Sequence, residues 1–143
     1  MMSKLLALLA MVSFSVIANA SDQLAVQTIK KMYETGKSLE KGNEIIYLYA
    51  DKILTRAINV ANEAENCISY DVMWQSNDPP YDRKVSYNLL DNNKVEVHLA
   101  EVAPYYEAET LIYDLNCSIG TCKITDVEDD LGSLVHNIYQ ECQ

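Results

Sequence analysis

The sequence predicts an α+β fold in which N-terminal helices pack on a curved antiparallel sheet of about four strands, followed by a short C-terminal helix and stapled by disulfides. Apolar residues recur at helical spacing up to about residue 65, whereas apolar and polar residues alternate between residues 85 and 127. These periods distinguish helices from half-buried strands. Helices that precede a run of strands are typical of the α+β class.

The first twenty residues have the features of a secretory signal peptide. Lys4 precedes an apolar run from Leu5 to Ala18, which ends in Ala18-Asn19-Ala20. A basic start, a short apolar segment and a small-residue site indicate cleavage, here after Ala20. A membrane anchor would need about 20 apolar residues, and the residue directly after Ala20 is Ser21 rather than a cysteine that could carry a lipid. We therefore expect export to the periplasm without membrane insertion, not as a lipoprotein, with residues 21–143 forming a single domain.

The charge of the chain is strongly acidic. It contains 11 Lys and Arg against 21 Asp and Glu. Lys4 is the only charged residue of the signal peptide, so its removal leaves a net charge of −11. Nucleic acids need a basic surface, so the composition argues against them as partners. It favours a basic protein partner, because opposite charges accelerate encounter; an acidic surface that serves only solubility is the alternative.

The four cysteines predict disulfides, since an even count is typical of exported domains. Three pairings are possible. Cys117 and Cys122 flank Ser-Ile-Gly-Thr and would face each other across a hairpin, which leaves Cys67 to pair with Cys142. A zinc site is the rival interpretation, but it lacks a C-x-x-C pair and nearby histidines. We expect no metal and no cofactor.

Two helical blocks are expected in the first half of the chain. Ser21 or Asp22 would cap the first, and the second spans about residues 44–65 with a break near Ala50-Asp51. The first helix carries apolar residues at helical spacing, namely Leu24, Val26, Ile29, Met32 and Tyr33. Residues 67–84 then predict turns, because Asn77-Asp78-Pro79-Pro80 cannot continue a helix. The single tryptophan, Trp74, should pack this segment onto the body.

Four strands follow in the second half. Residues 85–89 and 95–99 predict a hairpin, and a strand that begins at Tyr105 should pair with residues 123–127. Asp129 or Asp130 could cap the last helix. Its apolar stripe consists of Leu131, Leu134, Val135, Ile138 and Cys142.

Several short motifs resemble one bacterial family. Residues 73–78 (MWQSND), 122–127 (CKITDV) and 132–134 (GSL) are similar to segments of the YbjP/YqhG-like exported envelope proteins, a family of domains of unknown function. The resemblance implies the nuclear-transport-factor-two-like (cystatin-like) fold, in which a curved antiparallel sheet wraps around helices. It implies no catalytic residues.

The candidate chemistry is modest. Glu96 and His98 share the polar face of one strand and could perform acid–base catalysis, or could form a solvated surface. Asp126, Glu128, Asp129 and Asp130 could hold calcium, although the spacing favours a helix entry. His136 is expected to be exposed.

The tyrosines are more informative. The ten tyrosines combine apolar area with a polar tip, which suits binding surfaces and also the edge of a small core. Tyr105 and Tyr106, beside Glu107 and Glu109, would form an aromatic anchor within an acidic rim.

The leading hypothesis is a non-enzymatic periplasmic binding protein that engages a partner through this acidic, tyrosine-bearing sheet. Its sharpest form is an immunity protein or inhibitor that neutralises a basic, cell-wall-degrading effector. A small-ligand carrier or accessory envelope protein with a cone-shaped interior pocket is the alternative. An isomerase or lyase would further require a buried acid in that pocket.

Overall fold

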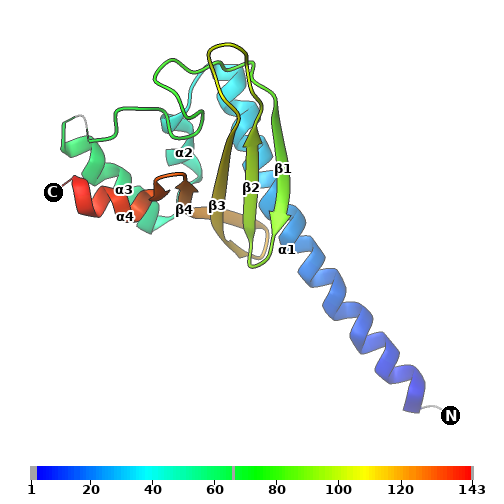
Figure 1. Ribbon diagram of the computed structural model, residues 1–143. Helices are drawn as coiled ribbons and strands as arrows, with labels where there is room; N and C mark the ends of the chain where they lie inside the picture. The colour runs from blue at the N-terminus through cyan, green and yellow to red at the C-terminus, as the bar shows by residue number, and fades with distance from the viewer. Residues whose placement is uncertain (1–2, 66, 143) are drawn as a thin grey trace.

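The computed structural model describes residues 3–65 and 67–142, with side chains described from residue 20 onward. Within these residues the chain forms four helices and one antiparallel sheet in the order β1-β2-β3-β4-β5 (Figure 1). The elements are α1 (Ser3–Leu39), α2 (Asn43–Tyr49), α3 (Lys52–Glu63), β1 (Val85–Leu90), β2 (Lys94–Leu99), β3 (Glu109–Ser118), β4 (Thr121–Asp129), β5 (Gly132–Ser133) and α4 (Leu134–Glu141). The α+β prediction is confirmed, and the two-residue β5 is an addition to it.

Helix α1 is continuous from Ser3 to Leu39, so the prediction that Ser21 or Asp22 caps its start is wrong. Residues 3–20 contain neither Pro nor Gly and are rich in Leu and Ala, which are strong helix formers. The backbone therefore has no cause to break there. Within the part of the chain that the structure describes, no helix is both long and apolar enough to cross a bilayer.

The predicted break in the second helical block is confirmed. Asp51 separates α2 from α3, and its carboxylate accepts the backbone N–H groups of Ile53 and Leu54, each at 2.9 Å. This is a side-chain N-cap, which satisfies backbone donors that the first turn leaves unpaired. The Asp51 N–H donates to Ile124 O at 2.8 Å, so the junction between the two helices lies against β4.

The sheet is a meander of antiparallel neighbours, with one register shift between Asp114 and Leu115 of β3. The β1–β2 and β3–β4 hairpins are both confirmed. Strand β3 begins at Glu109, so the expectation of a strand from Tyr105 is wrong. Strands β3 and β4 also pair through Ser118 and Thr121, which leaves Ile119 and Gly120 as the connecting residues. Gly120 adopts a positive φ, at 80°.

The C-terminal helix starts later than expected. Ser133 is its N-cap and accepts the His136 N–H at 3.1 Å, so the prediction of Asp129 or Asp130 as the cap is wrong. Leu131, which was placed on the apolar stripe, lies in the preceding turn and is 71% exposed. The reason is β5, which pairs Gly132 and Ser133 with the end of β4 and delays the helix.

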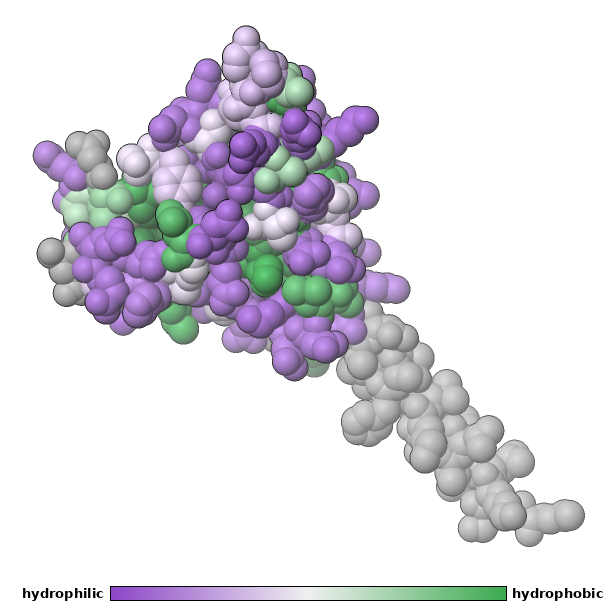
Figure 2. Space-filling view, in the orientation of Figure 1, coloured by the Kyte–Doolittle hydropathy of each residue, from purple (hydrophilic) through white to green (hydrophobic). Residues whose placement is uncertain are grey.

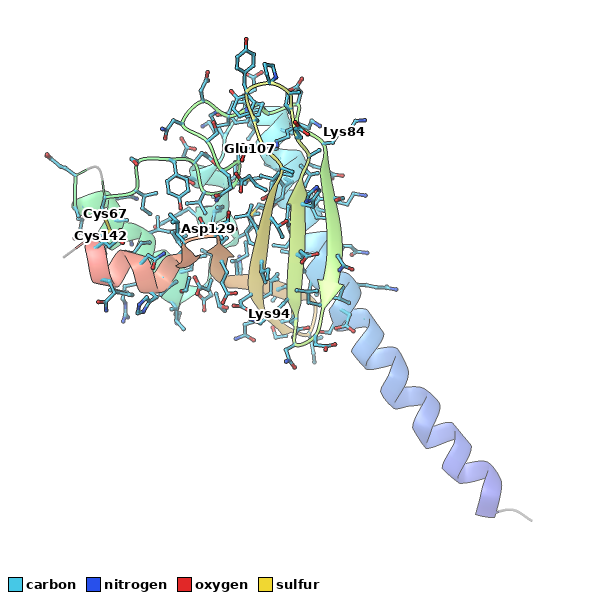
Figure 3. All side chains as sticks on the ribbon, in the orientation of Figure 1. Cys67, Lys84, Lys94, Glu107, Asp129 and Cys142 are labelled. Atoms are coloured by element: carbon cyan, nitrogen blue, oxygen red, sulfur yellow. A yellow bond between two sulfur atoms is a disulfide. The ribbon has the colours of Figure 1, made fainter. Side chains whose placement is uncertain are left out.

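Both predicted disulfides are present. Cys117 and Cys122 are direct cross-strand partners with Cα atoms 4.0 Å apart. The Cys67–Cys142 bond, with Cα atoms 5.5 Å apart, ties the segment after α3 to the end of α4 (Figure 3).

The core lies between α1 and one face of the sheet. Tyr33 from α1, Tyr113 from β3 and Trp74 from the 67–84 segment are each at most 2% exposed. The Tyr33 and Trp74 rings meet edge to face, with centroids 5.3 Å apart. The prediction that Trp74 packs its segment onto the body is therefore confirmed. Aromatic rings fill the space between α1 and the sheet in which the sequence placed an interior pocket.

Candidate functional site

The most exposed aromatic side chain among the described residues lies on a turn between β2 and β3. Tyr105 is 83% exposed. The turn, residues 102–106, is closed by Val102 and Tyr106, whose backbones exchange hydrogen bonds at 2.8 and 3.0 Å. The Tyr105 N–H also donates to Val102 O at 3.1 Å, across a cis Ala103–Pro104 bond. We call residues 102–106 the tyrosine turn.

A buried arginine fixes the base of this turn. Arg83 is 2% exposed. Its Nε donates to Ala100 O at 2.5 Å, and its Nη2 donates to Glu107 O. These two carbonyls flank the tyrosine turn in the chain. Burial lowers the pKa of Arg83 below its ordinary value, but a guanidinium stays protonated in proteins.

The second tyrosine of the pair anchors the turn on the other side. The Tyr106 hydroxyl donates to Asp78 O at 2.7 Å, which joins the turn to the 67–84 segment. Tyr106 is half-buried, whereas Tyr105 is free of such a contact among the described residues. The two tyrosines therefore have different roles, because one fixes the turn and the other projects from it.

Acidic residues flank the tyrosine turn in the chain and occur on the segment that Tyr106 contacts. These side chains are exposed. We call them the acidic rim: Asp78, Asp82, Glu101 and Glu107. In Figure 3, Glu107 and Lys84 lie towards one end of the sheet and Lys94 lies at the other.

Glu109 does not belong to this rim. It opens β3 opposite Leu99, which is fully buried, and opposite residues in a ladder point to the same face. The Glu109 side chain is half-buried. Its pKa is raised, first by desolvation and then by Asp130, against a lowering effect from Arg83. Of the four residues in the predicted anchor, the structure keeps Tyr105 and Glu107 exposed and assigns Tyr106 and Glu109 to packing.

Glu96 and His98 lie on the sheet face that is turned away from α1. They occupy alternate positions of β2, with Val95, Val97 and Leu99 buried on the opposite face. His98 Nδ1 is 3.4 Å from Thr110 Oγ1. This face is mostly hydrophilic (Figure 2), and within the described residues no group of three His, Cys, Asp or Glu side chains could hold a metal. The pair is on a strand face, separate from the tyrosine turn.

The acidic residues at the end of β4 serve mainly as hydrogen-bond acceptors. Asp126 accepts the Ser133 hydroxyl and the Val135 N–H, which fixes the start of α4. Asp129 accepts the Tyr70 hydroxyl at 2.8 Å and the Leu131 N–H at 2.8 Å. These contacts fit a structured entry to α4 and leave fewer carboxylate oxygens for calcium.

A half-buried carboxylate to which the sequence assigned no role lies in the 67–84 segment. Asp71 accepts the N–H groups of Asn43 and Trp74, each at 2.9 Å. A Cβ at Gly42 would lie 1.7 Å from this carboxylate, so only glycine fits there. Burial raises the Asp71 pKa, and the two N–H donors oppose the shift. The signal in the sequence was Asp71 three residues before Trp74, a spacing at which Asp closes a turn with its side chain.

Two cavities lie away from the space between α1 and the sheet. A cavity of about 220 Å³ is lined by residues from α2, α3 and α4 and by the segment after Cys67. A second, of about 160 Å³, lies on the other side of Cys67 and Ile68. Both share Leu134 as a wall. Asp71 lines a third, open hollow, but its two oxygens already accept N–H groups.

No family model, curated protein or solved structure matches the chain. The resemblance to YbjP/YqhG-like envelope proteins stays a prediction.

Proposed function

We propose that the protein is a non-enzymatic, exported binding protein that engages a basic protein partner through the tyrosine turn and its acidic rim. The observation that carries this proposal is the 83% exposure of Tyr105 on a turn whose backbone is held by its own hydrogen bonds, by Arg83 and by Tyr106. The sharpest form is an immunity protein that neutralises a basic, cell-wall-degrading effector in the periplasm. The first twenty residues act as its signal peptide.

The physical support is the low cost of ordering such a surface. A tyrosine brings a large contact area with few rotatable bonds, and tyrosine is enriched among the residues that dominate binding energies. Because the backbone of the turn is already fixed, binding does not have to order it. The exposed ring can also stack under a lysine or arginine of the partner.

The charge distribution selects a basic partner. From residue 85 onward the chain has 11 acidic residues against Lys94 and Lys123. Glu101 and Glu107 of the acidic rim belong to this part of the chain, so the rim is expected to attract cationic surfaces and repel nucleic acids. The two disulfides are consistent with an oxidising compartment such as the periplasm.

A small-ligand carrier is the second candidate, and the cavity of about 220 Å³ between α2, α3 and α4 is the observation in its favour. This cavity is a better candidate for a ligand site than the predicted cone-shaped interior pocket, because aromatic rings fill the space between α1 and the sheet. The lyase hypothesis has less support, since the hydrogen bonds of Asp71 indicate a structural role.

The test is binding to a defined basic effector, obtained by using the oxidised protein as bait in lysates of competing bacteria. We expect Tyr105→Ala to weaken the complex by about thirtyfold, as for a central contact residue, and added salt to weaken it further. Tyr47→Ala is the matched control, because Tyr47 is also exposed, at 42%, but lies on α2. Equal binding by Tyr105→Ala and wild type would exclude the tyrosine turn as the contact surface.

A further inference from the structure

The two edges of the sheet differ in how they are covered. At the β4 edge, β5 pairs with the end of the strand and the α2–α3 junction bonds to Ile124. At the other edge, β1 pairs with β2 alone, and no described strand lies beyond it (Figure 1). The six residues of β1 therefore form the open edge of the sheet.

The alternation of hydrogen-bonded pairs between β1 and β2 shows which backbone groups of β1 point away from the sheet. The Ala100 N–H donates to Lys84 O at 2.9 Å, which continues the β1–β2 register by one step from Val85–Leu99. Bonded and non-bonded pairs alternate in an antiparallel ladder. Val85, Tyr87 and Leu89 therefore point their N–H and C=O groups away from β2. In the described part of the chain, no hydrogen bond outside the ladders uses these backbone groups.

The edge lacks the usual protection against strand pairing. Proteins block open edges with charged side chains, proline or bulges. Strand β1 reads VSYNLL and contains no charge and no proline, and its six pairs with β2 run without a register shift. Leu89 is 36% exposed although it lies on the α1 side of the sheet. This neutral edge belongs to a chain that is otherwise rich in charge.

We propose that β1 pairs antiparallel with β1 of a second copy of this chain, around a two-fold axis at Tyr87. The two meanders would then join into one continuous sheet. Three hydrogen-bonded pairs form, Val85 with Leu89 of the second copy, Tyr87 with its equivalent, and Leu89 with Val85, which gives about six backbone hydrogen bonds. Apolar side chains face one another on the α1 side, and Ser86 faces Asn88 on the outer side.

The charges at the ends of the strand favour a second copy in this orientation. Lys84 precedes β1 and Asp91 follows it, and both are exposed. In this register Lys84 of each copy lies opposite Leu90 of the other, at the same end of the paired strands as Asp91, whereas parallel pairing would bring like charges together. The edge is thus complementary to itself. The residues of β1 are not part of the tyrosine turn, so a dimer could present two such turns.

Sedimentation of the full chain, purified as the cell processes it, tests the dimer from micromolar to millimolar concentration. We expect a reversible monomer–dimer equilibrium. Asn88→Lys should raise the dissociation constant by about tenfold or more, because it places two lysines diagonally across the new pair. Thr110→Lys is the matched control, since Thr110 is exposed on β3, between two strands, and should leave the constant unchanged.

A charge exchange tests the orientation with substitutions in exposed positions. Lys84→Glu and Asp91→Lys should each weaken the dimer several-fold, and the double variant should recover it. A protein that stays monomeric over the whole range would overturn the proposal. So would a dimer that Asn88→Lys weakens no more than Thr110→Lys does, or one in which the double charge variant fails to recover.

Discussion

At the scale of single residues, the buried tyrosines of the core form a directed chain of hydrogen bonds. The Tyr33 hydroxyl donates to Met73 O at 2.8 Å and lies 2.8 Å from the Tyr113 hydroxyl. Because Tyr33 uses its proton for Met73, Tyr113 must be the donor in the pair. Burial, followed by the influence of Tyr113, raises the pKa of Tyr33 well above its ordinary value, so both hydroxyls stay protonated.

This direction predicts unequal costs for removing the two hydroxyls. Tyr33→Phe leaves both Met73 O and the Tyr113 hydroxyl without a partner and should destabilise the fold by about 2–3 kcal/mol. Tyr113→Phe removes a donor but leaves the bond to Met73 intact, so we expect about 1 kcal/mol. Urea denaturation of the two variants measures the difference. Equal costs, or a larger cost for Tyr113→Phe, would contradict the assigned direction.

The sequence could not assign the tyrosines individually. Composition predicted that they would divide between a core edge and binding surfaces, and the structure buries Tyr33 and Tyr113 while it exposes Tyr105. Tyr113 was within reach, since it alternates with Leu111 and Leu115. In the sequence, Tyr105 and Tyr106 continue the same alternation. Their separation depends on Arg83, which lies more than twenty residues earlier in the chain, and such a contact leaves no local pattern.

At the scale of elements, the two disulfides stabilise the fold to different extents. The Cys67–Cys142 bond spans 75 residues and ties the segment after α3 to the end of α4, whereas Cys117–Cys122 spans five residues within one hairpin. A crosslink stabilises mainly by restricting the unfolded chain, and the effect grows with loop length. The long-range bond should therefore contribute more.

Replacing each pair by alanine tests this expectation. The loss of Cys67–Cys142 should cost about 4 kcal/mol and the loss of Cys117–Cys122 about 2 kcal/mol, measured by denaturant unfolding without reductant. The hairpin pair is the control for the loss of two sulfur atoms. If removal of the hairpin bond were the more damaging change, native packing around it would outweigh the chain-length effect.

Most elements could be predicted because their signals are local. The alternation of apolar and polar residues identified the β1–β2 hairpin, and Ala50-Asp51 marked the break between α2 and α3. The cysteine spacing identified both disulfides. The start of α4 was missed because Asp129 and Asp130 are good caps in isolation. The chain instead uses Asp129 to accept the Tyr70 hydroxyl, and β5 takes up the next residues. Tertiary contacts decide such boundaries.

At the scale of the whole molecule, the surplus of acidic groups works against folding at neutral pH. The net charge of the sequence is −10, so carboxylates repel one another in the compact state. Two of them carry a further cost, because desolvation raises the pKa of Asp71 and of Glu109 above the ordinary value for a carboxyl group.

These raised pKa values fix the sign of the pH dependence. Between the ordinary pKa of a carboxyl group and the raised value in the fold, the folded state binds more protons than the unfolded state. Stability therefore falls as the pH rises through that window and is greater at its acidic end. We expect the melting temperature to increase as the pH is lowered from neutral towards the ordinary pKa of a carboxyl group, because protonation relieves both effects.

Asp71→Asn separates the effect of this half-buried carboxylate on the pH dependence from that of the general repulsion. The amide can accept only one of the two N–H groups that Asp71 accepts, so this variant should be less stable throughout, but its melting temperature should change less with pH. Glu63→Gln, on the exposed end of α3, removes the same charge without burial and should keep the wild-type dependence. A melting temperature that falls on acidification in all three proteins would show that the carboxylates contribute more as ionised acceptors than their burial costs.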